Sequence, residues 1–273
     1  MPAPHQPHLK KKWGQNHLTD GRVCRPLVDF LGTAGRRVVE IGPGAGVLTR
    51  ELLAAGAAEV VGWEIDPEWA EAARREVGDG RFEVVVGDAL EIDWPALAAE
   101  AGEPILAAGN LPYNVATPII ENLLPHHASV PRAAFLVQKE VGERLVAGAG
   151  DSDYGYLSVL VAAYAEARWL GVVKRGSFRP PPKVDGAFVG LVLRPPPLPP
   201  AEMPAFLNTV SAAFRLRRKT LRNSLASAFP KPLASRVVGA LAEEEGWDPR
   251  VRAEALGLEE LLLLHRRLLA AAG

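Results

Sequence analysis

Apolar residues in the first two thirds of the chain fall into two alternating patterns. Short runs rich in Val, Ile and Ala alternate with segments whose apolar positions recur every three or four residues. The runs predict buried strands and the recurring spacing predicts amphipathic helices, an alternation typical of βαβ units around a parallel sheet. Two later apolar runs, 168–173 and 187–193, predict an antiparallel pair that closes the sheet. The other predicted strands are residues 38–41, 60–65, 82–86, 105–108 and 133–137, and helical patterns follow Gly46, Pro67, Trp94 and Thr117.

A proline-rich segment, RPPPLPP at residues 194–200, separates this region from the rest of the chain. Such a segment continues neither a helix nor a central strand and forms a stiff, extended connection. We therefore expect one domain over residues 1–195 and a second over residues 201–273. The second has helical patterns at 203–228, 233–245 and 258–271 and few strand formers. The predicted fold class is α/β, with a small all-helical C-terminal domain.

Composition narrows the class of protein. The chain has 273 residues, of which 48% are hydrophobic and 23% charged, as in ordinary globular proteins. Its formal net charge is −1, so any nucleic-acid site must be a local basic patch. No apolar run is long enough for a membrane span or a signal peptide, so we expect a cytoplasmic protein. The lone Cys24 allows no internal disulfide and no metal site of paired cysteines, and we expect no metal.

A glycine-rich turn follows the first predicted strand, where residues 40–46 read EIGPGAG. Gly42 and Gly44 allow a tight turn that brings the backbone close to a ligand. Turns of this kind bind nicotinamide, flavin and S-adenosylmethionine cofactors, and some are purely structural. Glu40 disfavours a pyrophosphate, because its charge repels phosphates but attracts the ammonium group of S-adenosylmethionine.

Two carboxylates stand at the ends of the next two predicted strands. Glu64 can accept both hydrogen bonds from a ribose diol. Asp88 can accept from an adenine amino group while the backbone N–H of Ala89 donates to a ring nitrogen. Each acid can instead simply cap the element that follows it. Together with the glycine turn, the two favour S-adenosylmethionine as the cofactor.

The segment Asn110-Leu111-Pro112-Tyr113 follows the fourth predicted strand, at the edge where open α/β sheets bind ligands. The lone pair of an aromatic amine is delocalised, so a site that methylates it must favour a pyramidal nitrogen. The Asn110 side-chain oxygen and the Leu111 carbonyl can accept its two N–H bonds. Pro112 would hold that carbonyl outward, and Tyr113 would stack on the base, with Phe178 either as a second wall or as a core residue.

These residues resemble the ribosomal RNA adenine dimethyltransferase family, specifically its bacterial small-subunit, KsgA type. The resemblance runs nearly end to end, and the departures are His17 where the family usually has Phe, Ala116 in place of Ser and Tyr156 in place of Arg. None of them removes a proposed chemical group. The matching stretches are residues 14–20, 40–46, 64–66, 87–89, 109–114, 138–141, 154–159, 178–185 and 217–223.

The resemblance implies a Rossmann-like methyltransferase sheet that uses S-adenosylmethionine and releases S-adenosylhomocysteine. It implies that Asn16 and Leu18 join the cofactor pocket, and that the cofactor contacts Gly42, Glu64, Asp88 and Asn110. The implied product is a pair of adjacent N6,N6-dimethyladenosines in a hairpin near the 3′ end of 16S rRNA, made on the assembling 30S subunit.

A basic cluster in the second domain is a candidate RNA contact. A cluster this short is usually a solvated helix face, but the resemblance favours binding to phosphates. Residues 10–12, three lysines, add a second basic run, and we expect a monomer. The cluster consists of Arg215, Arg217, Arg218, Lys219 and Arg222.

Three other functions compete with this interpretation. The chain could act chiefly as a binding factor in ribosome assembly, although the intact segment from Asn110 to Tyr113 favours activity. It could be the related large-subunit RNA adenine methyltransferase that confers macrolide resistance, which the stretches 180–185 and 217–223 disfavour. A nicotinamide dehydrogenase is the third alternative.

Overall fold

The structure is a computed structural model that describes residue 7 and residues 16–272. The predicted basic run Lys10–Lys12 and the first two residues of the stretch 14–20 lie outside the described residues. The chain forms two compact units, Met1–Gly142 with Ala165–Pro195, and Glu143–Tyr164 with Pro196–Gly273. We call them the sheet unit and the helical unit.

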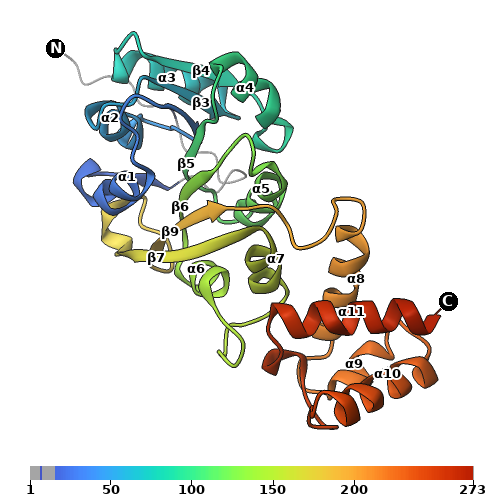
Figure 1. Cartoon of the computed structure of the whole chain (residues 1–273). Helices are drawn as coiled ribbons and strands as arrows, with labels where there is room; N and C mark the ends of the chain where they lie inside the picture. The colour runs from blue at the N-terminus through green and yellow to red at the C-terminus, as the bar shows by residue number, and fades with distance from the viewer. Residues whose placement is uncertain (1–6, 8–15, 273) are drawn as a thin grey trace. The chain divides into compact units, whose positions relative to one another are not determined.

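A seven-stranded sheet forms the centre of the sheet unit, with strand order β4-β3-β2-β5-β6-β9-β7 (Figure 1). The five strands from β4 to β6 are parallel, whereas β9 runs antiparallel to both β6 and β7. All seven predicted strands are confirmed, including the antiparallel pair that closes the sheet. Their bounds are β2 Arg37–Ile41, β3 Glu59–Glu64, β4 Phe82–Val86, β5 Leu106–Asn110, β6 Arg132–Gln138, β7 Ala165–Val173 and β9 Gly186–Leu193.

The chain order reverses at the boundary between β2 and β5. From β2 the chain adds β3 and β4 toward one edge, and it then returns to place β5 on the other side of β2. At such a point the connections leaving neighbouring strands part, and a crevice opens at the carboxyl ends of the strands. Gly109 lets β5 approach β2 closely, since a Cβ there would lie 2.6 Å from the Ile41 carbonyl oxygen.

Helices cover both faces of the sheet. On one face α1 (Arg25–Leu31), α2 (Val47–Ala54) and α3 (Pro67–Val77) bury apolar side chains in one core with the strands. On the other lie α4 (Trp94–Ala101) and α5 (Ala116–Leu123) (Figure 1). Side-chain capping begins two of these helices: at α3 the Asp66 carboxylate accepts from the Glu68 N–H and Pro67 fills the first turn, and at α4 Asp93 accepts from the Ala96 N–H. The four predicted helices are confirmed.

A second, very small sheet joins two distant parts of the sheet unit. Strand β1 (His17–Leu18) pairs antiparallel with β8 (Phe178–Arg179), so that Leu18 lies opposite Phe178. Both of these side chains point into the same core cluster. The residues just after Asn16 are thereby fixed to the segment that precedes β9.

The helical unit contains α7 (Tyr156–Tyr164), α8 (Met203–Phe214), α9 (Leu221–Leu225), α10 (Lys231–Glu244) and α11 (Leu258–Ala272). Helix α6 (Lys139–Val146) spans the junction of the two units. Helix α7 packs against α8 and α11, and the Tyr154 hydroxyl donates to the Leu256 carbonyl over 2.9 Å. A helical C-terminal region is therefore confirmed.

The structure divides the chain differently from the expected ranges 1–195 and 201–273. Residues 143–164 group with the helical unit, where α7 packs against α8 and α11. The predicted continuous helical stretch 203–228 is also interrupted. Helix α8 ends at Phe214 and α9 begins at Leu221, so the basic residues between them lie in turns rather than in a helix.

Candidate active site

The carboxyl ends of four neighbouring strands surround one hollow in the sheet unit, of about 570 Å³ including its open mouth. Five residues predicted from the sequence line it: Gly42, Glu64, Asp88, Ala89 and Pro112. Eight further lining residues are Ile41, Trp63, Ile65, Gly87, Leu90, Asn114, Val115 and Ile119.

The sequence analysis missed these eight, most of which are apolar. One signal pointed to them, because Ile65 and Leu90 each follow a predicted cofactor carboxylate within two residues. Both side chains remain about 40% exposed at the edge of the hollow, 42% for Ile65 and 40% for Leu90. Apolar side chains that stay exposed beside polar acceptors are what a flat aromatic ring requires on its two faces.

The glycine turn has the backbone conformation that the sequence predicted. Gly42, Gly44 and Gly46 have φ values of 66°, 53° and 71°, in the left-handed region that favours glycine. Gly42 lines the hollow, and a Cβ there would lie 3.8 Å from the Asn110 carbonyl oxygen. Gly44 does not line it but donates its N–H to the Glu64 carboxylate over 3.3 Å.

Glu64 is buried at the end of β3 and lines the hollow. One carboxylate oxygen accepts from the Gly44 N–H and the other from the Asp66 N–H, over 3.1 Å. Burial raises the pKa of this carboxyl, and the two backbone donors oppose that rise. A carboxylate offers about four acceptor positions, so the donors fix its orientation while leaving room for a diol.

Asp88 both caps a turn and lines the hollow. Its Oδ1 accepts from the Leu90 N–H over 2.9 Å, at the start of the 3-10 turn Ala89–Glu91. The capping role that the sequence left open is therefore present, and it orients the carboxylate beside Ala89. Capping and ligand binding do not compete here, because the second carboxylate oxygen is a further acceptor.

Glu40 lies behind the hollow and is fully buried. Its Oε2 accepts from the Thr49 hydroxyl over 2.6 Å. Burial raises the pKa of Glu40 to about 7, although the Thr49 hydrogen bond opposes the rise and the charge of Glu64 adds to it. Glu40 does not line the hollow, and its attraction for an ammonium group stays a prediction.

Asn110 ends β5, and one hydrogen bond fixes its side-chain amide. Its Nδ2 donates to the Asn16 carbonyl oxygen over 2.7 Å. The amide nitrogen is thus directed to the N-terminal segment, and Oδ1 is left on the other side as an acceptor. Asn16 itself does not line the hollow, and its place in the cofactor pocket stays a prediction.

The three residues after Asn110 are held by the sheet and by a turn. The Leu111 N–H donates to the Leu136 carbonyl over 3.0 Å, and the Pro112 carbonyl accepts from the Val115 N–H over 3.1 Å. Tyr113 is partly buried, and burial, together with the charge of Asp185, raises its pKa to about 12. Tyr113 therefore stays a neutral phenol at physiological pH.

Phe178 lies in β8 with only 3% of its surface exposed. Its ring belongs to the core cluster that also contains Leu18 and Phe188. The structure thus shows the core packing that the sequence left open as the alternative, and stacking on a base stays a prediction.

The basic cluster of the helical unit lies in the exposed segment from Arg215 to Arg222. Arg217 differs from its neighbours, because its Nη2 donates to the Ser152 carbonyl over 2.7 Å and to the Tyr154 carbonyl over 3.4 Å. It anchors a loop of the helical unit. The RNA-binding role of Arg215, Arg218, Lys219 and Arg222 stays a prediction.

Within the described residues, no group of three or more His, Cys, Asp or Glu side chains is placed to hold a metal ion. No helix in the same part of the chain has the length and apolar character needed to cross a membrane.

Comparison with known proteins gives one consistent family. The family model described as ribosomal RNA adenine dimethylase matches residues 7–240. The ribosomal RNA small subunit methyltransferase A of Anaeromyxobacter dehalogenans is 42% identical over 269 residues, covering 95% of this chain and 93% of that protein. The protein of the same description from Pseudomonas aeruginosa is 41% identical over 268 residues, covering 97% and 96%.

Two solved structures share the fold over nearly the whole chain. A dimethyladenosine transferase from Plasmodium falciparum superposes with a TM-score of 0.75 at 24% identity, covering 93% of this chain and 98% of that one. The 23S rRNA methyltransferase ErmE superposes with a TM-score of 0.69 at 28% identity, covering 93% and 99%. Both support a methyltransferase-type sheet followed by a helical region.

Proposed function

This chain belongs to the ribosomal RNA adenine dimethylase family, and we propose that it dimethylates adenines of small-subunit ribosomal RNA. The donor is S-adenosylmethionine, and the acceptors are the N6 amines of two adjacent adenosines in a hairpin near the 3′ end of 16S rRNA. The observation that carries the proposal is the fixed amide of Asn110 at the end of β5, two residues before Pro112, which lines the hollow. The identity of this chain to two proteins described as ribosomal RNA small subunit methyltransferase A, 42% and 41%, supports the choice of substrate.

The residues around the hollow fit S-adenosylmethionine. Glu64 would accept from the ribose hydroxyls, and Asp88 from the adenine amino group, while the Ala89 N–H donates to the ring. Ile65 and Leu90 would cover the adenine faces with apolar surface. When bound, S-adenosylmethionine supplies an electrophilic methyl group on a sulfonium.

The protein's contribution to the transfer is positioning. Asn110 Oδ1 and the Leu111 carbonyl would accept the two N–H bonds of the target amine, which draws its nitrogen toward a pyramidal shape and turns its lone pair to the methyl group. Tyr113 would stack on the base, which must be unpaired or flipped to reach the site. Transfer is then an in-line displacement aided by orientation, and the amine loses its proton afterwards.

The exposed basic residues of the helical unit would bind RNA phosphates. Arg215, Arg218, Lys219 and Arg222 present their charges to solvent, and such contacts give binding that weakens as salt rises. Acting on an assembling 30S subunit in the cytoplasm, the protein would work as a monomer. The net charge of −1 agrees with a local rather than a global RNA-binding surface.

Methylation of large-subunit RNA is the second candidate function, because the 23S rRNA methyltransferase ErmE is 28% identical to this chain in an alignment that covers 93% of this chain. One experiment separates the candidates. Methyl transfer from labelled S-adenosylmethionine is measured with unmethylated small-subunit particles and with large-subunit RNA, followed by mass analysis of the nucleosides. Dimethyladenosine from small-subunit particles alone is the expected result.

Label on large-subunit RNA would instead assign the resistance-type reaction. Binding of the cofactor and of small-subunit particles without any transfer would overturn the catalytic proposal and leave a binding factor. The variant Asn110→Ala is the internal control, since it should bind particles like the wild type and transfer little.

A further inference from the structure

The orientation of the Asn110 amide depends on a single described contact outside its own strand. An asparagine amide is nearly symmetric in shape, so the rotamer with Oδ1 and Nδ2 exchanged fits the same space. Only Nδ2 can donate to the Asn16 carbonyl, and a flipped amide would place two oxygens against each other. The position of Asn16 therefore decides which atom of the Asn110 amide is bound to the backbone and which is left as the acceptor on the other side.

Asn16 is held in turn by a very short strand pairing. Strand β1 follows it and contains only His17 and Leu18, paired with Arg179 and Phe178 of β8. Isolated two-stranded pairings of this length are weak, since three or more strands are normally needed for stability. The Leu18 side chain in the core and the His17 ring, stacked on Trp69 with centroids 4.2 Å apart, also hold β1, and a further hydrogen bond at the start of β8 supports its register.

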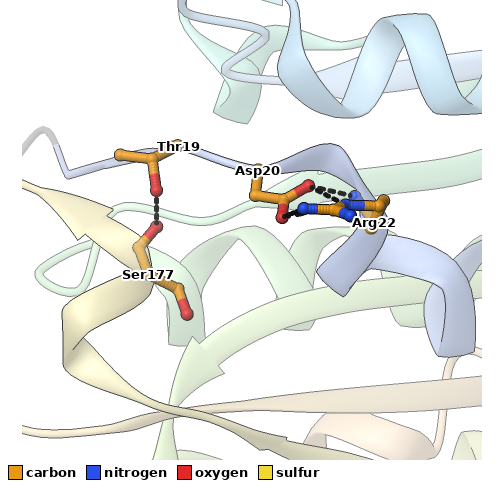
Figure 2. A network of polar contacts seen from close by, with 4 residues as sticks. All are labelled: Thr19, Asp20, Arg22 and Ser177. Atoms are coloured by element: carbon orange, nitrogen blue, oxygen red, sulfur yellow. Dashed lines mark hydrogen bonds and ion pairs between the residues drawn. The ribbon is translucent and has the colours of Figure 1, made fainter.

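Thr19 provides that support, as Figure 2 shows. Its backbone N–H and its hydroxyl both donate to the Ser177 carbonyl oxygen, over 3.0 Å and 3.1 Å. The two donors meet one acceptor at the point where β1 ends and β8 begins. Because Thr19 is exposed, its hydroxyl contributes this contact without packing in the core.

The Ser177 side of the contact is itself anchored. The turn Arg175–Ser177 is tied by Asp185, whose carboxylate accepts from the Arg175 N–H over 3.0 Å and pairs with Lys174 over 3.0 Å. The Asp185 carbonyl accepts from the Lys139 N–H, which follows β6 directly. A fixed carbonyl at Ser177 thus gives Thr19 a rigid point to bind.

We propose that Thr19 is a positioning residue for methyl transfer, acting through β1 and Asn16 to hold the Asn110 amide with Oδ1 toward the target amine. This inference rests on the proposed function. It assigns to an exposed threonine an effect on the reaction, although its side chain does not line the hollow. The hydroxyl does so by stabilising one of two amide orientations, not by touching a substrate.

The test compares three single variants as full-length proteins. Thr19→Val has nearly the same shape and keeps the backbone N–H but lacks the hydroxyl, and Thr19→Ser restores it. Arg22→Ala is the matched control, because Arg22 lies three residues after Thr19 and its ion pair with Asp20 is exposed. This substitution breaks the ion pair and leaves the contact between Thr19 and Ser177 intact (Figure 2). For each, kcat on unmethylated small-subunit particles and the dissociation constant for S-adenosylmethionine are measured.

We expect Thr19→Val to lower kcat about fivefold, the effect of one ordinary hydrogen bond. Thr19→Ser should recover the wild-type kcat, Arg22→Ala should match the wild type, and the cofactor dissociation constant should change less than twofold in all three. In an Asn110→Ala background, measured in single turnovers, Thr19→Val should have no further effect, because the amide it positions is gone. An unchanged kcat in Thr19→Val, or a full additional loss in the Asn110→Ala background, would overturn the inference.

If the wild type transfers no methyl group to adenine, the proposed function is wrong and kcat cannot test the role of Thr19. A spectroscopic measurement then tests that role without methyl transfer. The side-chain amide protons of Asn110 are followed by NMR hydrogen exchange in the wild type and in Thr19→Val. Faster exchange in the variant supports positioning by Thr19, and equal exchange contradicts it.

Discussion

The hollow at the strand ends and the basic segment of the helical unit differ in the burial and in the hydrogen bonding of their polar side chains. Around the hollow, the two carboxylates are buried or half-buried and each accepts from backbone N–H groups, Glu64 from Gly44 and Asp66, and Asp88 from Leu90. The five basic residues between Arg215 and Arg222 are exposed, and among them Arg217 alone has a side-chain hydrogen bond to another of the described residues.

This difference follows from what each region would have to do. Orienting a reactive amine requires acceptors whose direction is set before the substrate arrives, and burial among hydrogen-bond partners sets it. Binding RNA phosphates requires charge in solvent, where long side chains adapt to an irregular polyanion. The hollow should therefore respond to single-atom changes and to pH, and the basic segment to salt.

The largest effect is expected at Asn110. Replacing it with Ala removes the Oδ1 acceptor proposed to bind the target amine, so kcat should fall about 100- to 1,000-fold, as for loss of one preorganised hydrogen-bonding group. Thermal unfolding should change little, because within the described residues the side chain makes one hydrogen bond, to the Asn16 carbonyl. If kcat of Asn110→Ala stays within tenfold of the wild type, the hollow does not depend on a preorganised acceptor at Asn110, and it then does not differ from the basic segment in this respect.

The next effect is on the pH dependence of stability, through Glu40. Burial raises its pKa from 4.5 to about 7, so the folded protein holds a proton that the unfolded chain releases. Stability should therefore fall as pH rises from 4.5 to 7 and level off above, by about 3 kcal/mol in total. Glu40→Gln removes the titration and can still accept from Thr49, so the variant should lose this slope in urea unfolding measured at several pH values. If the unfolding free energy of Glu40→Gln depends on pH as steeply as that of the wild type, Glu40 does not hold a proton in the folded protein.

A smaller effect is expected at Asp88. Asp88→Asn can still cap the Leu90 N–H but loses the charged acceptor, so the dissociation constant for S-adenosylmethionine should rise about tenfold with kcat unchanged at saturation. Asp93→Asn is the matched control, because Asp93 caps α4 in the same way through the Ala96 N–H and does not line the hollow. Calorimetry on both variants measures the difference, and equal effects would show that capping alone explains Asp88.

The smallest effects are expected in the basic segment. Arg218→Ala should weaken binding to small-subunit RNA about threefold and lower the magnitude of its salt slope by about one. Arg217→Ala should change that slope less and destabilise the protein by about 1 kcal/mol, since it loses the hydrogen bonds to Ser152 and Tyr154. Lys231→Ala, an exposed charge of α10, is the control for nonspecific charge loss. If Arg217→Ala and Arg218→Ala behave alike, the distinction between an anchored and a free arginine fails.

Most of the fold could be predicted from the sequence, because it rests on local patterns. Buried parallel strands carry short apolar runs and amphipathic helices carry a regular spacing, so all seven strands of the main sheet and the helices between them were found. The glycine turn and the acids after β3 and β4 were found for the same reason, since strand ends mark their place. Residues 143–164 were misplaced because a helix that continues directly from the sheet unit carries no signal of the core in which its side chains will pack.

The sequence by itself determined the order of elements, the family and the residue types available for chemistry. Only the tertiary structure decided which of these groups meet, because contacts across long stretches of chain leave no local pattern. The bond between Asn110 and Asn16 joins residues 94 positions apart, and that between Thr19 and Ser177 joins residues 158 apart. Neither pair could be read from spacing, yet these contacts fix the direction of the amide on which the proposed chemistry depends.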